Sequence, residues 1–255
     1  RQNPKALEAS FVVLFKIKTI AIIKIKKTIE KLSGTESRVL ITGPTGSGKE
    51  LVARKIHKHS HRQKEAFVVI NAAALKENIY EKELFGQEFE DGNVSFGALE
   101  RANNGTLLID EVSEIPYETQ ANVLRVLIDQ KFKRINSNHD IKVNVRIICT
   151  SSKNINNETQ LGNFREDLFH RLNVFQISIE PLSSRVSDIP LLIEYFSKKI
   201  SKAYNLKDLN IDKEDTYLMN HFWPGNVREL RNLIERIAIL SNNCLLYTSP
   251  SPRDS

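Results

Sequence analysis

Residues 38–56 place an apolar run, a glycine-rich loop and an amphipathic run in an order that constrains the fold strongly. RVLIT at 38–42 is typical of a buried strand, and ELVARKI at 50–56 is typical of a helix. The loop between them, GPTGSGK, carries three glycines and ends at Lys49. A loop in this position presents backbone amides to an anion at the helix N-terminus. The segment therefore predicts a phosphate-binding loop in an α/β fold.

The residues of this loop suit a nucleoside triphosphate. Gly46 and Gly48 would let the backbone approach the phosphates, and Lys49 would reach the β- and γ-phosphate oxygens. Glu50 stands where a hydroxyl usually helps to hold magnesium. A glycine-rich turn without a ligand is the alternative, but the flanking strand and helix favour a ligand. The candidate nucleotide-binding residues of the loop are Gly43, Pro44, Thr45, Gly46, Ser47, Gly48, Lys49 and Glu50.

A second apolar run, at 106–109, ends in two carboxylates, Asp110 and Glu111. Ligands of α/β proteins bind at the carboxyl ends of the strands, which is where these two side chains are expected. Asp110 can hold Mg²⁺ through water, and Glu111 can orient and polarise an attacking water. With Lys49, the pair predicts a site for ATP and Mg²⁺; an acidic turn after a buried strand is the structural alternative.

The remaining pattern divides the chain into an α/β part and a helical part. Further strands are predicted at 67–70, 143–149 and 174–179, and helices at 20–32 and 119–130. Alternation of strands and helices implies a mainly parallel sheet. After Pro181 only helical patterns remain, at 189–203, 213–221 and 226–240.

These patterns predict four segments. Residues 1–32 form an N-terminal segment with an amphipathic helix, of which the first 19 fit neither helix nor strand clearly. An α/β nucleotide-binding domain follows at 33–183 and a small helical domain at 184–243. The tail 244–255, CLLYTSPSPRDS, is rich in Ser and Pro, so we expect it to be disordered. Its composition also raises the hypothesis that it is not the native continuation.

Composition narrows the class of protein. The chain has 255 residues, 40% of them hydrophobic, which is enough for a globular core. Two cysteines are too few for a disulfide framework and favour a reducing, cytoplasmic setting. Lysines interrupt the apolar run at 11–29, which argues against a membrane span. The net charge of +6 is modest and is interpreted as a solvated face.

Two arginines in FREDLFHRL, Arg165 and Arg171, are six residues apart on a predicted helical segment. Arginine suits the stabilisation of phosphoryl charge across a subunit boundary. Taken alone, however, charged residues at such positions usually face water.

Six segments occur in the order of a known family: RVLITGPTGSGKEL, FVVINAAAL with KELFG, GTLLIDE, FREDLFHRLNV, PLSSRVSDIPLLIEYF and WPGNVRELRNLIER. Across residues 33–243 the chain resembles the AAA+ ATPase domain of bacterial enhancer-binding proteins, the sigma-54 activators of the NtrC class. The resemblance implies a P-loop NTPase with a mainly parallel sheet sandwiched by helices, followed by an all-helical lid.

The resemblance also implies roles for individual residues. Asn71 matches the residue that restrains the catalytic Glu111 until ligand is sensed. Arg165 and Arg171 match arginine fingers that act in trans, which requires a ring or another homo-oligomer. Arg228 in WPGNVREL matches the second sensor on the lid. Glutamate after the loop lysine is common in this family, which implies that Mg²⁺ is held by phosphate oxygens, water and the Asp110 side.

The chain departs from the family pattern at two places. Between Glu88 and Glu100 it reads FEDGNVSFGAL, where activators carry a longer segment with the GAFTGA loop that engages sigma-54. Ser151 and Ser152 stand where activators usually have Thr-Asn. Serine is shorter and lacks the amide fork, so sensing of the γ-phosphate is expected to be weaker. Both departures resemble the NtrX branch, which keeps the fold without that loop.

The sequence therefore predicts an ATP-binding and ATP-hydrolysing module of a two-component response regulator of the NtrX type. The resemblance implies a receiver domain before it and a helix-turn-helix domain after it, so that DNA is contacted only through the latter. Contact with the sigma-54 polymerase is not expected. The alternatives are a sigma-54 activator with a diverged loop, and a nucleotide-binding oligomerisation module with little turnover. Subunit number, promoters, cognate kinase and signal do not follow from the sequence.

Overall fold

A computed structural model describes residues 20–206, 209, 211–213 and 215–244. The first 19 residues and, apart from Cys244, the tail predicted to be disordered lie outside the described residues. The chain divides into two compact units. The α/β unit comprises Ile23–Pro44 and Gly48–Ile179, and the helical unit contains Thr45–Ser47 with the chain from Glu180 onward.

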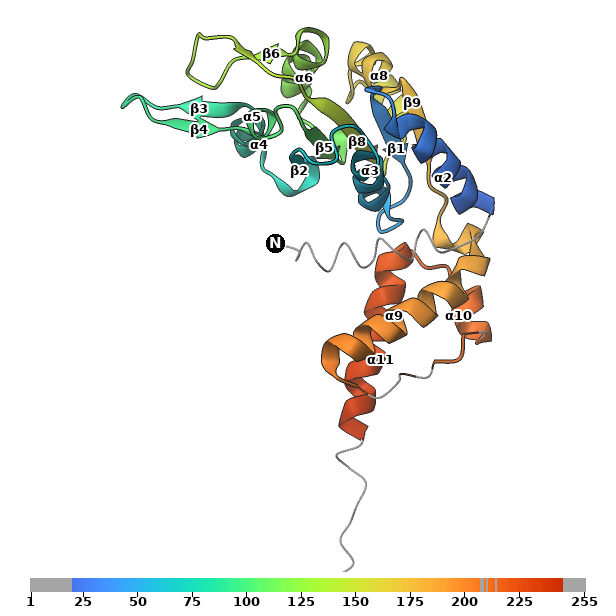
Figure 1. Cartoon of the computed structure of the whole chain (residues 1–255). Helices are drawn as coiled ribbons and strands as arrows, with labels where there is room; N and C mark the ends of the chain where they lie inside the picture. The colour runs from blue at the N-terminus through green and yellow to red at the C-terminus, as the bar shows by residue number, and fades with distance from the viewer. Residues whose placement is uncertain (1–19, 207–208, 210, 214, 245–255) are drawn as a thin grey trace, which may run out of the picture. The chain divides into compact units, whose positions relative to one another are not determined.

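The α/β unit is built on a five-stranded parallel sheet with the order β2-β5-β8-β1-β9. Its strands are β1 Val39–Thr42, β2 Phe67–Asn71, β5 Thr106–Asp110, β8 Arg146–Ser151 and β9 Phe175–Ser178. Figure 1 shows β2, β5, β8 and β1 side by side. The predicted α/β class with a mainly parallel sheet is confirmed.

Helices and two short hairpins complete this unit (Figure 1). The helices are α2 Ile20–Ser33, of which the part from Ile23 belongs here, α3 Lys49–Lys58, α4 Glu77–Phe85, α5 Ala98–Arg101, α6 Tyr117–Asp129, α7 Ile155–Gln160 and α8 Glu166–Leu172. The hairpins pair β3 Gly86–Glu88 with β4 Val94–Phe96, and β6 Lys131–Phe132 with β7 Ile141–Lys142. Helix α3 packs against β1, β5 and β8, so the residues that open it are fixed relative to the sheet.

The central strands form the core of the unit because almost all their side chains are buried. Leu107, Leu108 and Ile109 of β5 and Ile148 of β8 are 0 or 1% exposed. Such continuous apolar strands are expected when both faces of a parallel sheet are covered. Cys149 lies in the same layer, and burial raises the pKa of its thiol to about 12, as for an unreactive core thiol.

One predicted strand differs from the observed one. The run 143–149 was expected to be a single strand, but β8 begins at Arg146. The backbone amides of Val143 and Val145 instead donate to the carbonyl and side-chain oxygens of Gln130, both at 2.9 Å. Gln130 has φ 51 and ends α6, so this helix end takes the hydrogen bonds that a longer strand would have used.

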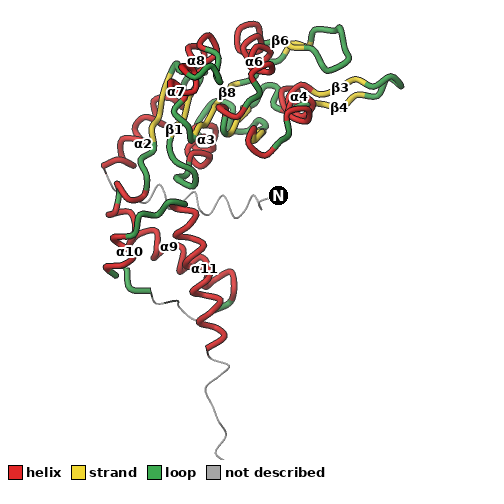
Figure 2. Tube along the Cα trace, turned by 180° about the vertical axis from the view of Figure 1, so that it is seen from behind, coloured by secondary structure: helices red, strands yellow, loops and turns green. Residues whose placement is uncertain are grey.

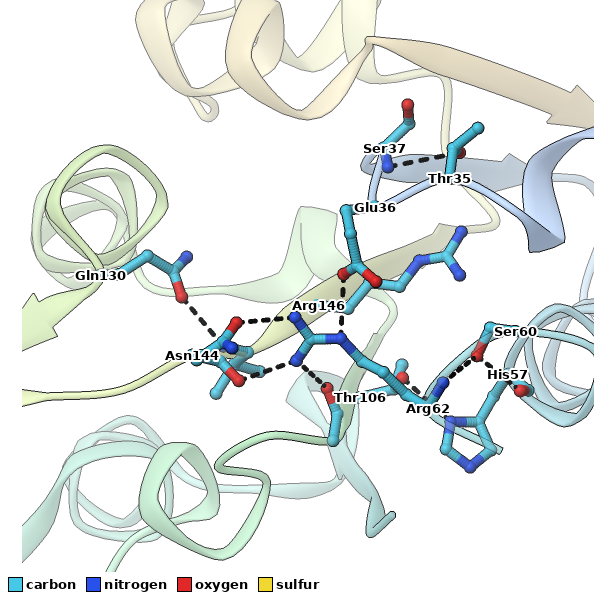
Figure 3. Close-up of polar contacts among 12 residues, drawn as sticks. Thr35, Glu36, Ser37, His57, Ser60, Arg62, Thr106, Gln130, Asn144 and Arg146 are labelled. Atoms are coloured by element: carbon cyan, nitrogen blue, oxygen red, sulfur yellow. Dashed lines mark hydrogen bonds and ion pairs between the residues drawn. The ribbon is translucent and has the colours of Figure 1, made fainter. Parts of the chain in front are cut away.

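Hydrogen bonds from polar side chains link the segments that precede β5, β8 and β1 to one another. Arg62 donates to the Glu36 carboxylate at 2.9 Å, to the Gly105 carbonyl at 3.0 Å and to both oxygens of Asn144 at 2.8 and 2.6 Å (Figure 3). Arg146, drawn in the same view, is 2% exposed and donates to a carbonyl of α2 at 2.9 Å. These contacts lie before the strands and so hold the edge opposite the predicted site.

The helical unit consists, in its described residues, of helices and loops without a strand (Figure 2). Two 3-10 turns, η3 Leu182–Ser184 and η4 Val186–Asp188, lead into α9 Ile189–Tyr204, which packs against α11 Asn226–Cys244. Both helices carry buried side chains, such as Phe196 of α9 and Ile234 of α11. The predicted all-helical C-terminal part is confirmed.

Helix α10, Thr216–Asn220, is shorter than the predicted helix at 213–221. Asp215 caps it, because its carboxylate accepts from the amides of Tyr217 and Leu218 at 2.8 and 3.1 Å. After α10 the chain turns extended, and Trp223, 2% exposed, packs edge-on against His221 with a centroid distance of 4.7 Å.

Candidate functional site

The carboxyl ends of three neighbouring strands bring the predicted site residues of the α/β unit together. In the register of the sheet, Ile109 is opposite Cys149, and Thr42 is opposite Ser151. The residues that follow β1, β5 and β8 therefore meet at one edge. The amide of Gly43 donates to the Ser151 carbonyl at 3.2 Å, which ties the start of the glycine loop to the end of β8.

Lys49 opens α3, and its ammonium is turned back into the loop. Its Nζ donates to the Gly43 carbonyl at 2.8 Å and to the Pro44 carbonyl at 3.4 Å. It also pairs with Glu111 Oε1 at 3.1 Å, and the Lys49 side chain is only 6% exposed. The structure therefore brings Lys49 and Glu111 together, although they follow different strands of the sheet.

Asp110 is fixed by two neighbours on the adjacent strands. Its Oδ2 accepts from Asn71 Nδ2 at 2.8 Å, and its Oδ1 accepts from Thr150 Oγ1 at 2.5 Å. Burial raises the pKa of the Asp110 carboxyl; the Thr150 hydrogen bond opposes this, and the charges of Glu111 and Glu50 add to it. A carboxyl group destabilised as an anion by its surroundings is suited to a cation.

Glu111 adopts a left-handed backbone conformation with φ 56, uncommon for a residue other than glycine. Its amide donates to Thr150 Oγ1 at 3.0 Å. Its Oε2 accepts from the amide and the hydroxyl of Ser152, both at 2.7 Å. Burial would raise the pKa of Glu111, but the Ser152 hydrogen bonds and Lys49 outweigh it and lower the pKa below its ordinary value.

Asn71 contacts Asp110 in this structure. Its Nδ2 donates to that carboxylate, and its Oδ1 accepts from the Ala74 amide at 3.1 Å. The residue that holds Glu111 is Ser152, from the other side of β5. The role expected for Asn71, restraint of Glu111, stays a prediction. The sequence motifs gave no sign that Ser152 contacts Glu111.

Glu50 forms an ion pair with Arg54 one turn along α3, at 2.7 Å, with both side chains about one-third exposed. The Glu50 carboxylate, which stands in place of the usual hydroxyl, is thus neutralised on the surface of α3. Its charge still reaches Asp110 and contributes to raising the pKa of that carboxyl.

Arg165 and Arg171 lie at the two ends of α8, on the surface of the α/β unit. Arg165 pairs with Asp167 at 2.8 Å, and its amide donates to Gln120 at 2.8 Å. Arg171 lies close enough to Arg38 to lower the pKa of that guanidinium, after burial as the larger cause. Neither contact places these arginines with Lys49, Asp110 and Glu111, and a role for them in another subunit's site stays a prediction.

In the helical unit, the middle of the glycine loop contacts residues that the sequence analysis did not single out. Asn226, 2% exposed with φ 52, donates to the Thr45 carbonyl at 3.0 Å and accepts from the Leu182 amide at 2.8 Å. Arg185, 5% exposed, donates to the Ser47 carbonyl at 3.0 Å. Both belong to segments that carried the family resemblance, but no local pattern in the sequence marks them.

Gly46 and Arg228 also lie together in this unit. Gly46 has φ 77, and a Cβ atom on it would be 2.2 Å from the Gly225 carbonyl oxygen and 3.2 Å from Arg228 Cβ. The exposed Arg228 lines a cavity of about 460 Å³ with Thr45 and Trp223 among its neighbours. The lid arginine predicted to contact nucleotide is therefore next to one of the predicted loop residues.

Comparison with known proteins agrees with the fold. Residues 16–178 match the family model described as "Sigma-54 interaction domain", and residues 183–252 match "AAA+ ATPase lid domain". Among curated proteins, the chain is 46% identical over 220 residues to the nitrogen assimilation regulatory protein NtrX of Azorhizobium caulinodans, covering 86% of this chain and 48% of that protein. It is 40% identical over 237 residues to the regulatory protein AtoC of Escherichia coli, covering 91% and 51%.

Among solved structures, NtrX from Brucella abortus in complex with ADP has a TM-score of 0.85 at 44% identity, covering 88% of this chain and 50% of that one. The complex of the same protein with ATP has a TM-score of 0.83 at 43% identity, with the same coverage of 88% and 50%. The chain spans about half the length of the curated relatives it matches. Among the described residues, no helix is long and apolar enough to cross a membrane. The chain belongs to the sigma-54 interaction domain family, with an AAA+ lid domain after its α/β unit.

Proposed function

We propose that the chain is the ATP-binding and ATP-hydrolysing module of an NtrX-like response regulator that controls transcription in the bacterial cytoplasm. The observation that carries the proposal is the meeting of Lys49, Asp110 and Glu111 at the carboxyl edge of one sheet. A cation, a partly buried carboxyl and an ionised carboxylate are the groups that phosphoryl transfer to water needs. The structures of NtrX from Brucella abortus in complex with ADP and with ATP support the choice of nucleotide.

In this proposal, Lys49 and the loop amides bind the phosphates. Gly48 precedes α3 with φ 106, so the first amides of a ten-residue helix follow the loop directly. Lys49 is held beside the loop by the Gly43 carbonyl and by Glu111, partners that phosphate oxygens would replace. Arg228, on the helical unit, is proposed to contact nucleotide as the lid sensor.

Asp110 is proposed to hold Mg²⁺ through water. A contact through water would fit an ion that keeps several waters and takes its other oxygens from phosphate. Asn71 and Thr150 fix both carboxylate oxygens, so the orientation of Asp110 is set before any ligand arrives. When bound, the ion would neutralise charge on the phosphate oxygens.

Glu111 is proposed to orient the attacking water and accept its proton. The hydrogen bonds from Ser152 and the charge of Lys49 keep the pKa of Glu111 below its ordinary value, so the carboxylate is ionised at neutral pH. An ionised carboxylate beside the phosphate-binding lysine can accept a hydrogen bond from water in line with the γ-phosphate.

The arginines of α8 are proposed to complete the site of a neighbouring subunit. Arg165 directly precedes α8 and is partly exposed, and Arg171 lies in its last turn and is exposed, so both can be reached by a neighbouring copy. This arrangement requires head-to-tail contacts between copies of the chain, in a ring or another homo-oligomer.

The output of the module is proposed to be assembly rather than remodelling of the sigma-54 polymerase. The β3–β4 hairpin, where activators carry the GAFTGA loop, has only residues 89–93 between its strands. In the whole regulator, a receiver domain and a helix-turn-helix domain would supply the signal and the DNA contact. A sigma-54 activator with a diverged loop is the second candidate; ATP-dependent stimulation of sigma-54 open complexes by the chain would favour it over the first.

Phosphate release measured against protein concentration tests the ATPase proposal. Activity should rise more than linearly with concentration, and Glu111→Ala should abolish it. Glu114→Ala is the matched control, because Glu114 is a nearby carboxylate that pairs with Lys153 at 2.8 Å. Nucleotide binding without phosphate release in the wild-type chain would favour an oligomerisation module with little turnover instead.

A mixing experiment tests the trans arginines. Glu111→Ala and Arg165→Ala chains are each expected to be inactive alone. If Arg165 serves a neighbouring site, a mixture regains activity, because an intact Glu111 can then face an intact Arg165 from another subunit. Failure of the mixture to exceed the sum of the two separate activities would contradict action in trans.

A further inference from the structure

A polar cavity of about 330 Å³ lies at the amino edge of the parallel sheet, within the α/β unit. Its lining includes Glu36 and three arginines, Arg38, Arg62 and Arg146. Arg38 directly precedes β1, and Arg146 opens β8, the strand that pairs with β1 in parallel. Lys49 follows β1 and lies at the opposite, carboxyl edge, so the cavity is separate from the proposed nucleotide site.

Arg146 has two hydrogen-bond donors that nothing in the described part of the chain accepts. The residue is 2% exposed, and its Nη2 donates to the Leu32 carbonyl at 2.9 Å. Its Nε and Nη1 are buried as well, and no described residue accepts a hydrogen bond from either. Burial lowers the pKa of Arg146; the Glu36 carboxylate opposes this shift, and the charge of Arg62 adds to it. Buried donors on a cation are almost always paired, so these two call for a negatively charged acceptor.

The charges around the cavity are not balanced. Three guanidinium groups and a single carboxylate line it, which leaves an excess of two positive charges. The Glu36 carboxylate accepts from Arg62 Nε at 2.9 Å (Figure 3). Arg38 is half-buried, burial lowers its pKa, and its Nη2 donates to the Leu127 carbonyl. Carbonyl oxygens thus accept from Arg38 and Arg146 but do not neutralise them.

We propose that this cavity binds a small phosphate-type dianion, with Arg38 and Arg146 as its donors and Arg62 as a further positive charge beside it. The planar fork of a guanidinium matches the oxygens of a phosphate. A cavity of about 330 Å³ is near the lower end of ligand pockets, which span about 300–1,000 Å³, so it suits a small anion. The site goes beyond the proposed function, because it uses no residue of the nucleotide site.

Glu36 is the group with which such an anion would compete. Its side chain is 54% exposed, and it is the one carboxylate among the described residues that line the cavity. Its charge favours the guanidinium of Arg146, as the charge of a bound phosphate would. Because Arg146 also binds the Leu32 carbonyl near the end of α2, the anion would strengthen the junction between α2 and the sheet.

Calorimetric titration with inorganic phosphate tests the site, at constant ionic strength and in a Lys49→Ala background that disables the glycine loop. Arg38→Gln and Arg146→Lys should each weaken phosphate binding about tenfold, the loss expected for one hydrogen bond between charged groups. Glu36→Gln should tighten it about threefold or more, because the competing carboxylate is gone. Arg125→Gln is the matched control: this exposed arginine of α6 lies outside the cavity, and its loss should leave the affinity unchanged.

Three results would overturn the proposal. Unchanged phosphate affinity in both arginine variants would show that Arg38 and Arg146 only hold the edge of the sheet. Unchanged or weaker binding by Glu36→Gln would do the same, and this substitution is at an exposed position where folding is not at risk. Binding that is present in the wild-type chain but lost in the Lys49→Ala background would place the anion at the glycine loop instead.

Two further titrations define the ligand. Acetate that binds as tightly as phosphate would overturn the choice of a phosphate-type dianion. Phenyl phosphate separates two sources of the same chemistry, and either result supports the site. Binding as tight as that of inorganic phosphate would indicate a phosphoryl group on a larger molecule, whereas weaker binding would indicate free phosphate.

Discussion

Replacing Gly46 with alanine is expected to destabilise the helical unit through two separate effects. The position has φ 77, where an L-residue costs roughly 1–2 kcal/mol. The new Cβ would also be 2.2 Å from the Gly225 carbonyl oxygen, and relieving such an overlap costs about 1–3 kcal/mol. Together they predict a loss of about 2–5 kcal/mol in the free energy of unfolding.

The other glycines of the chain separate these effects. Gly92 has φ 81 with nothing within 4 Å of its ideal Cβ, so Gly92→Ala should cost only the backbone part. At Gly97 no positive φ is involved, but a Cβ would meet the Gly86 amide nitrogen at 2.4 Å, so Gly97→Ala should cost only the steric part. Gly34 has neither feature, and Gly34→Ala should be neutral or stabilise by about 0.4–1 kcal/mol.

Urea unfolding with two signals measures the series. The chain has one tryptophan, and Trp223 is buried in the helical unit, so its fluorescence follows the unit in which Gly46 and Gly225 meet. Far-ultraviolet circular dichroism follows both units. If Gly46→Ala shifts the Trp223 transition no further than Gly34→Ala does, the reasoning from the Gly225 contact is refuted.

Three further predictions follow from single contacts. Asn226→Ala should cost about 2–4 kcal/mol in unfolding free energy, because one buried and one partly buried backbone group lose their hydrogen bonds and alanine is strained at φ 52; Asn226→Gly should recover the backbone part. Burial, followed by the charge of Arg146, lowers the pKa of His57 in the folded chain below the ordinary histidine pKa of 6.5. The free energy of unfolding should therefore fall as the pH drops below 6.5, and it should level off below the pKa of the folded state. Urea titrations at a series of pH values should show that His57→Gln loses this dependence. Glu50→Ala should change unfolding free energy by less than about 1 kcal/mol, because its ion pair with Arg54 is partly exposed; a larger loss in urea unfolding would show that the loop depends on Glu50.

The elements around the site could be predicted because local pattern decides them. An apolar run before the loop became β1, and the amphipathic run after it became α3. Helix α11 also follows from periodicity. The start of β8 could not be predicted, since it depends on whether Gln130 or a strand takes the amides of Val143 and Val145. That competition is decided by the end of α6 and not by the residues of the strand.

The meeting of Lys49, Asp110 and Glu111 at one edge of the sheet could also be predicted, but their hydrogen-bond partners could not. Lys49, Asp110 and Glu111 follow from motif and sheet edge, whereas the choice between Asn71 and Ser152 as the partner of Glu111 depends on rotamers and on φ at Glu111. Both candidate partners flank β5 at the same edge, so spacing does not distinguish them. Which of two polar neighbours becomes the hydrogen-bond partner of a side chain is decided by the geometry of the folded chain.

Gly46 illustrates why a motif can be correct for an incomplete reason. The sequence assigns it to close approach of phosphate, yet the Gly225 carbonyl already excludes a Cβ at that position without any ligand. Likewise, Asn226 and Arg185 bind the carbonyls of Thr45 and Ser47, so these loop positions are held by the protein itself. Glycine at position 46 therefore meets a demand of the helical unit in addition to the one that the sequence motif predicts.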